Sequence, residues 1–157
     1  MNDLGLKVGM LILVVPDIEA AVDFYTRLGL PKRFHLKSNW AEFALGDIKL
    51  GICPTSQQLP DRHTGIVLEV ADMEALRKEL EERGIPLLEE PKVAPHGIMA
   101  SFKDTGNNII ELYQPTPEKV RDLVQKVVDK EDGCCKGEDE QCVESNECST
   151  EDKGGCC

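Results

Sequence analysis

Apolar and polar positions follow one order along the first third of this chain. Residues 8–15 are almost continuously apolar, which predicts a buried strand. Asp17 is suited to cap a helix that follows, because its side chain can accept from the free backbone N–H groups of the first turn. Gly29 and Pro31 predict where that helix ends. The apolar residues between them recur at helical spacing and predict the buried stripe: Ile18, Val22, Tyr25 and Leu28.

The same order starts again 55 residues later. The recurring residues are Leu68, Val70, Asp72, Glu74, Ala75, Gly84 and Pro86, which repeat Leu13, Val15, Asp17, Glu19, Ala20, Gly29 and Pro31. Short strands are predicted after each helix, at 33–37, 40–45 and 48–53 in the first copy and at 86–89, 98–103 and 108–113 in the second. Each copy is therefore a βαβββ unit that is too small to bury its own core. The cleft between two such units is where we expect function.

A third helix and a tail follow the two copies. Thr116 and Pro117 predict the start of the helix, and its apolar stripe consists of Val120, Leu123, Val124, Val127 and Val128. From Asp132 onward apolar periodicity is lost and Gly, Ser, Glu and Asp dominate, which predicts a disordered tail. The predicted organisation is a two-repeat domain at 1–116, with repeats at 8–55 and 64–116, a helix at 117–131 and a tail at 132–157.

Composition narrows the possible partners. The chain has 157 residues, of which 41% are hydrophobic, and this is enough for one domain with a packed core. Its formal net charge of −11 argues against nucleic acid and against an anionic membrane surface as partners. The apolar stretch near the N-terminus, residues 10–15, is too short to cross a membrane or to form a signal core. We therefore expect a cytoplasmic protein.

Two segments carry a resemblance to a known family. The sequence "VVPDIEAAVDFYTRLGL" in the first repeat and "SFKDTGNNIIELYQ" in the second resemble the vicinal oxygen chelate superfamily. That superfamily includes glyoxalase I, bleomycin-resistance proteins, fosfomycin-resistance enzymes and extradiol dioxygenases. The resemblance covers residues 8–115 and implies an α+β fold, in which two tandem βαβββ modules form a curved mixed sheet around a cleft. It also implies a homodimer, since many members complete their cleft across two chains.

The resemblance further implies where a catalytic metal would be held. Metal-using members place a His seven residues before each helix-capping Asp, and acids in the last strand of each repeat. In this chain Met10 and Gly65 take the positions of the two His residues, and alignment of "ICPT" with "YQPT" places Leu50 opposite Glu111. One hard ligand in four does not hold a divalent ion, so we expect no metal in the cleft. His63 lies two residues before Gly65 and is the one imidazole that could join Glu111 on the same strand face.

Several residues are candidates for chemistry or for ligand contact. Glu111 and His96 are the candidate catalytic residues: Glu111 is a general base or an acceptor for substrate, and His96 lies in the loop before a cleft strand. A structural carboxylate and an exposed loop histidine are the competing interpretations. The candidates for lining a small-molecule pocket are Met10, Trp40, Phe43, Leu50, Gly65, Met99 and Tyr113. Trp40 and Phe43 would wall a cup for a planar ligand, with ordinary core packing as the alternative.

The cysteines are concentrated in the tail. Of seven, Cys53 lies in the body and is most simply a small buried hydrophobe. The other six are Cys134, Cys135, Cys142, Cys148, Cys156 and Cys157. Their spacing is not that of a structural zinc module, but adjacent thiols suit soft ions such as Cu(I), Hg(II), Cd(II) or trivalent arsenic, with Zn as a further possibility. An inert tail is the alternative, and a prenylated Cys-Cys ending is disfavoured by the acidic surroundings.

These patterns lead to one preferred function and two alternatives. The preferred function is a glyoxalase-like or bleomycin-resistance-like protein that binds a small molecule in its cleft without the usual metal, and whose tail binds soft metal or metalloid ions. The first alternative is a lyase, isomerase or dioxygenase that uses Glu111. The second is a metal buffer or metallochaperone that acts through the tail. Whether the protein is an enzyme stays open at this point.

Overall fold

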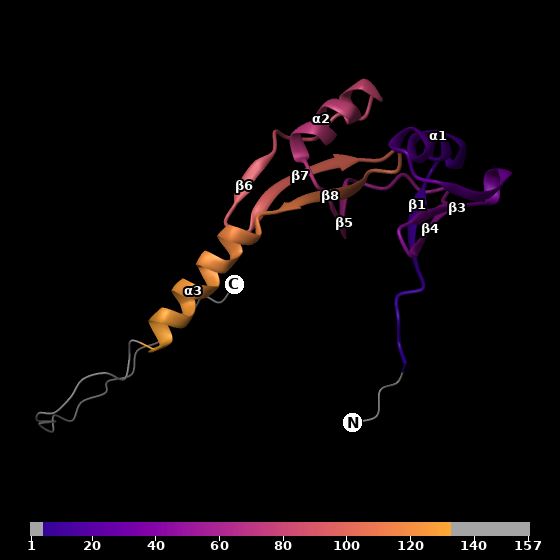
Figure 1. The fold of residues 1–157 in the computed structure, drawn as a ribbon. Coiled ribbons are helices and arrows are strands. Elements are labelled where there is room, and N and C mark those ends of the chain that lie inside the picture. The colour runs from indigo at the N-terminus through magenta and orange to yellow at the C-terminus, as the bar shows by residue number, and fades with distance from the viewer. Residues whose placement is uncertain (1–4, 133–157) are drawn as a thin grey trace, which may run out of the picture.

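The computed structural model describes residues 5–132. The elements follow in the order β1 (Met10–Val15), α1 (Ile18–Leu28), β2 (Lys32–Leu36), the 3-10 turn η1 (Lys37–Asn39), β3 (Trp40–Leu45), β4 (Ile48–Pro54), β5 (Arg62–Glu69), α2 (Met73–Glu82), β6 (Lys92–Ala94), β7 (Gly97–Lys103), β8 (Asn108–Pro115) and α3 (Pro117–Asp132). Two βαβββ units are therefore present, as the repeat predicts (Figure 1).

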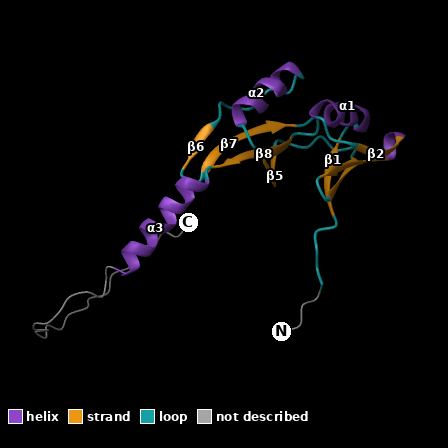
Figure 2. Ribbon diagram, in the orientation of Figure 1, coloured by secondary structure: helices purple, strands orange, loops and turns teal. Residues whose placement is uncertain are grey.

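The two units form mixed sheets of the same topology. The strand orders are β1-β4-β3-β2 and β5-β8-β7-β6. In each sheet the first strand pairs in parallel with the last, and the last three strands pair antiparallel. Figure 2 shows α1 and α2 side by side over the two sheets, with α3 projecting from the body. The first strand of each unit is thus an edge strand of its sheet.

Helix capping explains why the two copies share their first half. The Asp17 carboxylate accepts from the backbone N–H of Ala20 at 3.1 Å, and Asp72 accepts from that of Ala75 at 2.9 Å. Gly29 ends α1 with φ 95°, a left-handed conformation that glycine adopts without steric cost. The predicted starts of both helices and the glycine end of α1 are confirmed.

One face of each sheet packs under the helices. Side chains alternate across a strand, so Leu13 and Val15 of β1 point into the core while Ile12 is 55% exposed on the other side. The core cluster draws residues from both units, including Phe24 and Phe102, whose rings lie 6.0 Å apart. The faces of the two sheets that point away from the helices remain open.

Buried polar contacts join the two units. The Tyr25 hydroxyl of α1 donates to the Asp104 carboxylate in the β7–β8 turn at 2.7 Å. The backbone carbonyl of Val14 accepts from the Arg62 guanidinium at 2.7 Å and from the Asn108 side chain at 3.2 Å. These contacts bring β1 and β5 side by side, so that the two edge strands face each other across a seam.

One predicted strand of the second module lies elsewhere in the structure. The strand expected at 86–89 is wrong: Leu87 forms only an isolated bridge with Phe102, and the edge strand lies at Lys92–Ala94 instead. Pro86 has no N–H to donate and the acidic residues at 89–90 lead into a second proline, which interrupts pairing there. The expected tail lies outside the described residues from position 133 onward. Among the described helices, none is long and apolar enough to cross a membrane.

Candidate functional site

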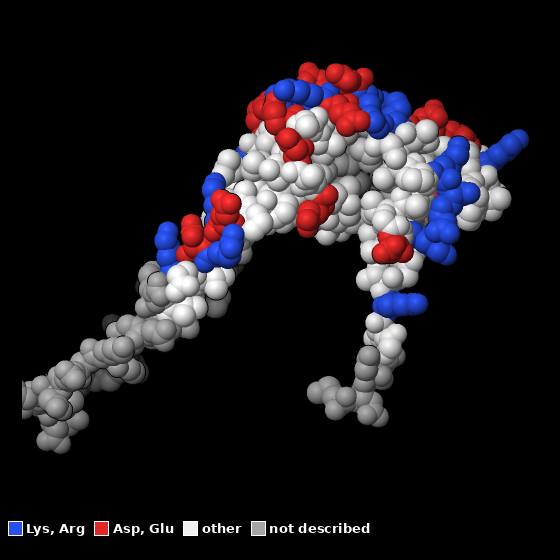
Figure 3. All heavy atoms as spheres, viewed as in Figure 1, with Lys and Arg blue, Asp and Glu red and all other residues white. Residues whose placement is uncertain are grey.

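The open faces of the two sheets line a hollow. Figure 3 shows the body as an arch that is hollowed on one side, between α3 and the N-terminal segment. On the first sheet this face is mostly apolar, because Ile12, Phe34 and Leu36 are 55%, 45% and 59% exposed. Large exposed apolar side chains gathered on one face are typical of a surface that binds a ligand or another protein.

An aromatic platform stands at the centre of the first open face. A Cβ atom built on Gly51 of β4 would lie 2.4 Å from Cη2 of Trp40 and 3.0 Å from the sulfur of Met10. Any side chain at position 51 would therefore clash, and the glycine lets the indole of Trp40 lie directly over the β4 backbone. Trp40 and Met10 are both partly exposed. The first module thus offers a flat apolar surface to the hollow.

A buried carboxylate lies beside this platform. Glu42 of β3 pairs in register with Gly51 and is 6% exposed, and its carboxylate lies 3.3 Å from Nε of the half-exposed Arg33. A buried carboxylate needs such a partner, since an unpaired charge in an apolar setting is costly. Glu42 is consequently held in place at the border between the apolar platform and solvent.

The second open face carries polar groups instead. Nδ1 of His63 lies 3.7 Å from Oε1 of Glu111, and Ser101 is the cross-strand partner of Glu111. A cavity of about 150 Å³ is lined by Met99, Ser101 and Glu111 together with Glu89, Glu90 and Lys92. The strand pairing of β5 with β8 shifts between His63 and Val67, where Gly65 has φ +72°. This bulge re-aims the strand and leaves His63 facing Glu111.

The two remaining polar candidates meet at the rim of this face. The Tyr113 hydroxyl donates to the backbone carbonyl of His96 at 2.9 Å, and their rings are 5.4 Å apart. His96 is exposed in the turn between β6 and β7. Tyr113 therefore anchors the turn that carries His96, while it is His63 that the structure places beside Glu111.

Two sequence-predicted pocket residues lie in the core. Leu50 is 2% exposed and Phe43 is fully buried against Tyr25, with ring centroids 5.7 Å apart. The alignment that set Leu50 opposite Glu111 is one residue out, because the β1–β4 and β5–β8 registers make Gly51 the counterpart of Glu111. Leu50 points under the helices and Gly51 lies on the open face. Met10, Trp40, Gly65, Met99 and Tyr113 remain at least partly accessible.

The residues present do not fit the four-ligand metal site of the fold. Counted by register, the four positions hold Met10, Gly51, Gly65 and Glu111, and His63 adds one imidazole. Within residues 5–132 there is no group of three or more His, Cys, Asp or Glu residues arranged to hold a metal ion. An imidazole and a carboxylate alone make a weak site for a divalent cation. The six tail cysteines lie outside the described residues.

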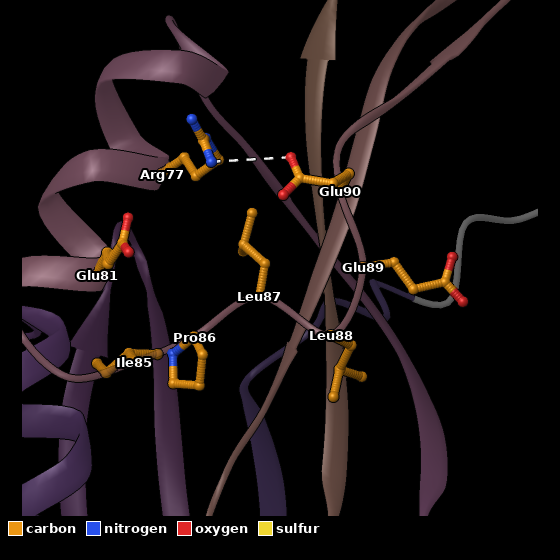
Figure 4. A pocket seen from close by; sticks show the side chains of 8 residues that line it. All are labelled: Arg77, Glu81, Ile85, Pro86, Leu87, Leu88, Glu89 and Glu90. Atoms are coloured by element: carbon orange, nitrogen blue, oxygen red, sulfur yellow. Dashed lines mark ion pairs between the residues drawn. The ribbon is translucent and has the colours of Figure 1, made fainter.

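A separate pocket opens on the outer side of the second module. Figure 4 shows it between α2 and residues 85–90, with the Arg77 guanidinium reaching across to Glu90 at 3.7 Å. Its volume is about 300 Å³, and Glu81, Glu89 and Glu90 contribute three acids to the lining. Arg77 is the one cation among the lining residues and is already paired with Glu74 and Glu90. Glu89 has a partner in Lys92, outside the lining, and the lining itself keeps an excess of acids.

Sequence reasoning did not identify Gly51 and Glu42 as site residues. The sequence did contain a signal for Gly51. It follows Leu50 directly, and moving the alignment of the two repeats by one residue would have placed Gly51, instead of Leu50, opposite Glu111 and on the open face of the strand. The sequence placed His63 on the strand face of Glu111, and the two side chains lie 3.7 Å apart. The β5 bulge between His63 and Val67 was not predicted.

Comparisons with known proteins agree with the fold. The sequence profile of the Glyoxalase/Bleomycin resistance protein/Dioxygenase superfamily matches residues 7–112. Three solved structures share the fold. The fosfomycin resistance protein FosX from Listeria monocytogenes is 17% identical, with TM-score 0.62 and coverage of 78% of this chain and 99% of that one. The bleomycin-binding protein from Streptomyces verticillus, in complex with copper(II)-bleomycin, is 22% identical, with TM-score 0.59 and coverage of 73% and 100%. The antibiotic binding protein TnmS3 from Streptomyces sp. CB03234 is 26% identical, with TM-score 0.57 and the same coverage.

Proposed function

Because this chain belongs to the Glyoxalase/Bleomycin resistance protein/Dioxygenase superfamily, we propose that it binds a small, partly planar organic molecule in the hollow between its two open sheet faces. The observation that carries the proposal is the indole of Trp40 lying over Gly51 beside Met10. A flat, partly exposed indole favours stacking with a planar ligand. One structural neighbour is a bleomycin-binding protein and another is an antibiotic binding protein, which supports a binding role for this fold.

The ligand binds without a cleft metal in this proposal. Three of the four positions that would hold the ion carry Met10, Gly51 and Gly65, none of which is a hard donor. The polar contacts come instead from Glu111, His63 and Tyr113 of the second module. A ligand with one apolar face and one edge of hydrogen-bond donors matches this division.

The test uses Trp40 as its own reporter. It is the only tryptophan in the chain, so its fluorescence reports on the platform alone. A panel of planar aromatic compounds is titrated while Trp40 emission and the melting temperature are followed. A true ligand changes both with one dissociation constant, because binding to the folded state alone raises stability.

A substitution then locates the ligand. Trp40→Leu is expected to weaken binding by about two- to tenfold, since a stacking contact contributes roughly 0.5–1.5 kcal/mol beyond its buried area. Leu88→Ala is the control, because Leu88 is 44% exposed and lines the outer pocket, which does not include Trp40. Calorimetry measures both variants. If Trp40→Leu binds the compound as tightly as the Leu88 variant does, the platform is not the binding site.

A catalytic role is the second candidate, and one distance favours it. His63 and Glu111 are 3.7 Å apart beside a small cavity, which is within reach of a proton relay through a bound substrate. In this alternative the protein is a lyase, isomerase or dioxygenase-type enzyme in which Glu111 is the general base. Glu111→Gln would abolish turnover of any accepted substrate and leave its binding on Trp40 intact. Full turnover by that variant would eliminate this alternative.

The tail supports a further proposal that lies outside the described residues. Six cysteines between positions 134 and 157 suit Cu, Hg, Cd, As or Zn, and if this binding is the main role, the protein is a metal buffer or metallochaperone. Elemental analysis of reduced full-length protein beside a variant with all six cysteines changed to serine tests it. Equal soft-metal content in both proteins would refute tail binding.

The assembly and the location of the protein also remain proposals. Exposed apolar residues on the N-terminal segment (Leu6 and Val8) and on α3 (Val124 and Val128) would be covered in a homodimer. Analytical ultracentrifugation tests this, and a monomer at micromolar concentration would contradict it. The cytoplasmic location is tested by cell fractionation.

A further inference from the structure

Another cavity lies beneath the two helices and is lined by residues of both modules. Its volume is about 470 Å³, which lies within the roughly 300–1,000 Å³ usual for small-molecule sites. Both modules contribute aliphatic side chains to it, among them Leu11, Leu28, Ile66, Leu68, Leu76 and Leu80. Val67 and Glu69, which point to the other face of β5, also line the cavity at the edge of that strand, whereas Trp40 is not among the lining residues.

The lining of this cavity is incompletely packed. Leu11, Leu28, Ile66, Leu68 and Leu76 all belong to the partly buried residues that surround the core. The cavity opens to solvent, so these aliphatic side chains are only partly covered. An apolar chain that fills the cavity would remove this surface from water, which is favourable. The cavity therefore offers the chemistry of a site for an aliphatic chain.

Two guanidinium groups lie at the edge of this region. A smaller cavity of about 190 Å³ shares Leu28, Leu76 and Leu80 with the larger one and is also lined by Arg83. Arg83 donates to the backbone carbonyl of Arg27 at 3.0 Å, and Arg27 donates to that of Arg83 at 2.9 Å. The main chain thus holds two like charges near each other at the junction of α1 and α2.

The guanidinium groups of Arg27 and Arg83 have more N–H donors than the contacts just described use. Each has five N–H donors in a fixed fork. Arg27 uses Nη1 on two carbonyls, while Arg83 contacts one carbonyl and the carboxylate of Glu79. An incoming carboxylate would offset the repulsion between the two arginines and would compete with Glu79 for Arg83.

We propose that this helix-side cavity binds an unbranched aliphatic carboxylate, with its chain among the leucines and its carboxylate at Arg83 and Arg27. A neutral or cationic headgroup would gain nothing at two guanidinium groups, and a short carboxylate would leave the cavity unfilled. This ligand is different from the planar molecule of the open face, and the two sites are occupied independently.

The experiment is a calorimetric titration of full-length protein, after extraction of copurified lipid, with dodecanoate. Dodecan-1-ol and dodecyltrimethylammonium serve as headgroup controls. Dodecanoate is expected to bind saturably at one molecule per chain, about tenfold more tightly than the alcohol, because charge-assisted hydrogen bonds are the stronger ones. Equal affinity for the three amphiphiles would overturn the assignment of the headgroup to the arginines.

Three substitutions place the ligand. Arg83→Gln should weaken dodecanoate binding by about tenfold, because it removes the guanidinium that binds the carboxylate. Glu79→Gln should strengthen binding, because it removes the carboxylate that competes for Arg83. Arg77→Gln, on the same helix but in the outer pocket, is the matched control and should bind as the parent does. Both arginine side chains are at least one-third exposed, so the variants should fold, which thermal unfolding checks. Equal loss in the Arg83 and Arg77 variants would refute the site.

The emission of Trp40 separates this site from the open face. Dodecanoate in the helix-side cavity should leave the fluorescence of Trp40 unchanged at saturation, because Trp40 does not line this cavity. Quenching that follows the calorimetric binding curve would place the aliphatic chain on the open face and overturn the proposal. Failure of planar compounds to bind would leave this result unaffected.

Discussion

The hydrogen bond between Tyr25 and Asp104 predicts how stability responds to one deleted oxygen atom. The Tyr25 ring is buried and its hydroxyl donates to the Asp104 carboxylate at 2.7 Å, across the two modules. Hydrogen bonds to charged groups contribute about 1.5–3 kcal/mol. Tyr25→Phe keeps the ring and removes only this bond, so we expect its free energy of unfolding at pH 7 to fall by about 2 kcal/mol.

The same contact gives that loss a pH dependence of known sign. Burial, then the nearby Asp104 charge and then the hydrogen bond all hold the pKa of Tyr25 far above its ordinary value of 10.0. Folded Tyr25 therefore keeps its proton when the unfolded chain begins to lose it, and the stability it contributes is complete below pH 10 and declines above. At pH 11 the deficit of Tyr25→Phe should be smaller by about 1.4 kcal/mol than at pH 7.

Urea unfolding of the parent and the variant between pH 7 and pH 11 measures this difference. Tyr113→Phe is the matched control, because its hydroxyl donates to an exposed backbone carbonyl, and its effect should stay within about 0.5 kcal/mol. A deficit of Tyr25→Phe that does not change between pH 7 and pH 11 would refute the reasoning that the buried phenol stays protonated.

Three further substitutions test how the modules are built. Asp17→Ala removes the cap of α1 and should lower the free energy of unfolding by about 1 kcal/mol in urea titrations; no change would mean that water replaces the cap. Gly97→Ala would place a Cβ atom 2.3 Å from the carbonyl oxygen of Gln114, so its melting temperature should fall by several degrees. Arg62→Gln removes the donor to the Val14 carbonyl and should lower the free energy of unfolding by about 1.5 kcal/mol. An unchanged midpoint of urea unfolding would show that other contacts hold β1 against β5.

The sequence predicted the fold well because its repeat combines local signals with a period. Asp17 and Gly29 each specify one helix end by their own chemistry, and both predictions are confirmed. The edge strand was predicted at 86–89 and lies at Lys92–Ala94. Leu87 forms only an isolated bridge with Phe102, and no local sequence pattern near Pro86 and Pro91 distinguishes such a bridge from a strand. The pattern of apolar residues also does not determine the register between strands, so Leu50 was aligned with Glu111, although Gly51 is its counterpart.

The candidate site was predicted in part, and the missing part depended on contacts between strands. Trp40 was identified from its residue type and position, and Glu111 from the family resemblance, which implies an acid in the last strand of the repeat. The sequence placed His63 on the strand face of Glu111, but the β5 bulge near Gly65 was not predicted, because a bulge arises from pairing rather than from propensity. The burial of Glu42 beside Arg33 likewise became visible only when β2 and β3 were placed together.

Comparison of the two modules supports the proposal of a planar ligand rather than a metal ion in the hollow. The cross-strand pair that holds the acid in the second module is Ser101 and Glu111, and its counterpart in the first is Glu42 and Gly51. The first module thus has its carboxylate one strand further from the seam, where Arg33 neutralises it, and gives the vacated position to the indole of Trp40. A divalent ion needs converging donors from both modules. Because one module presents an aromatic surface and the other a carboxylate with an imidazole, we propose that the ligand of the hollow has two unlike faces.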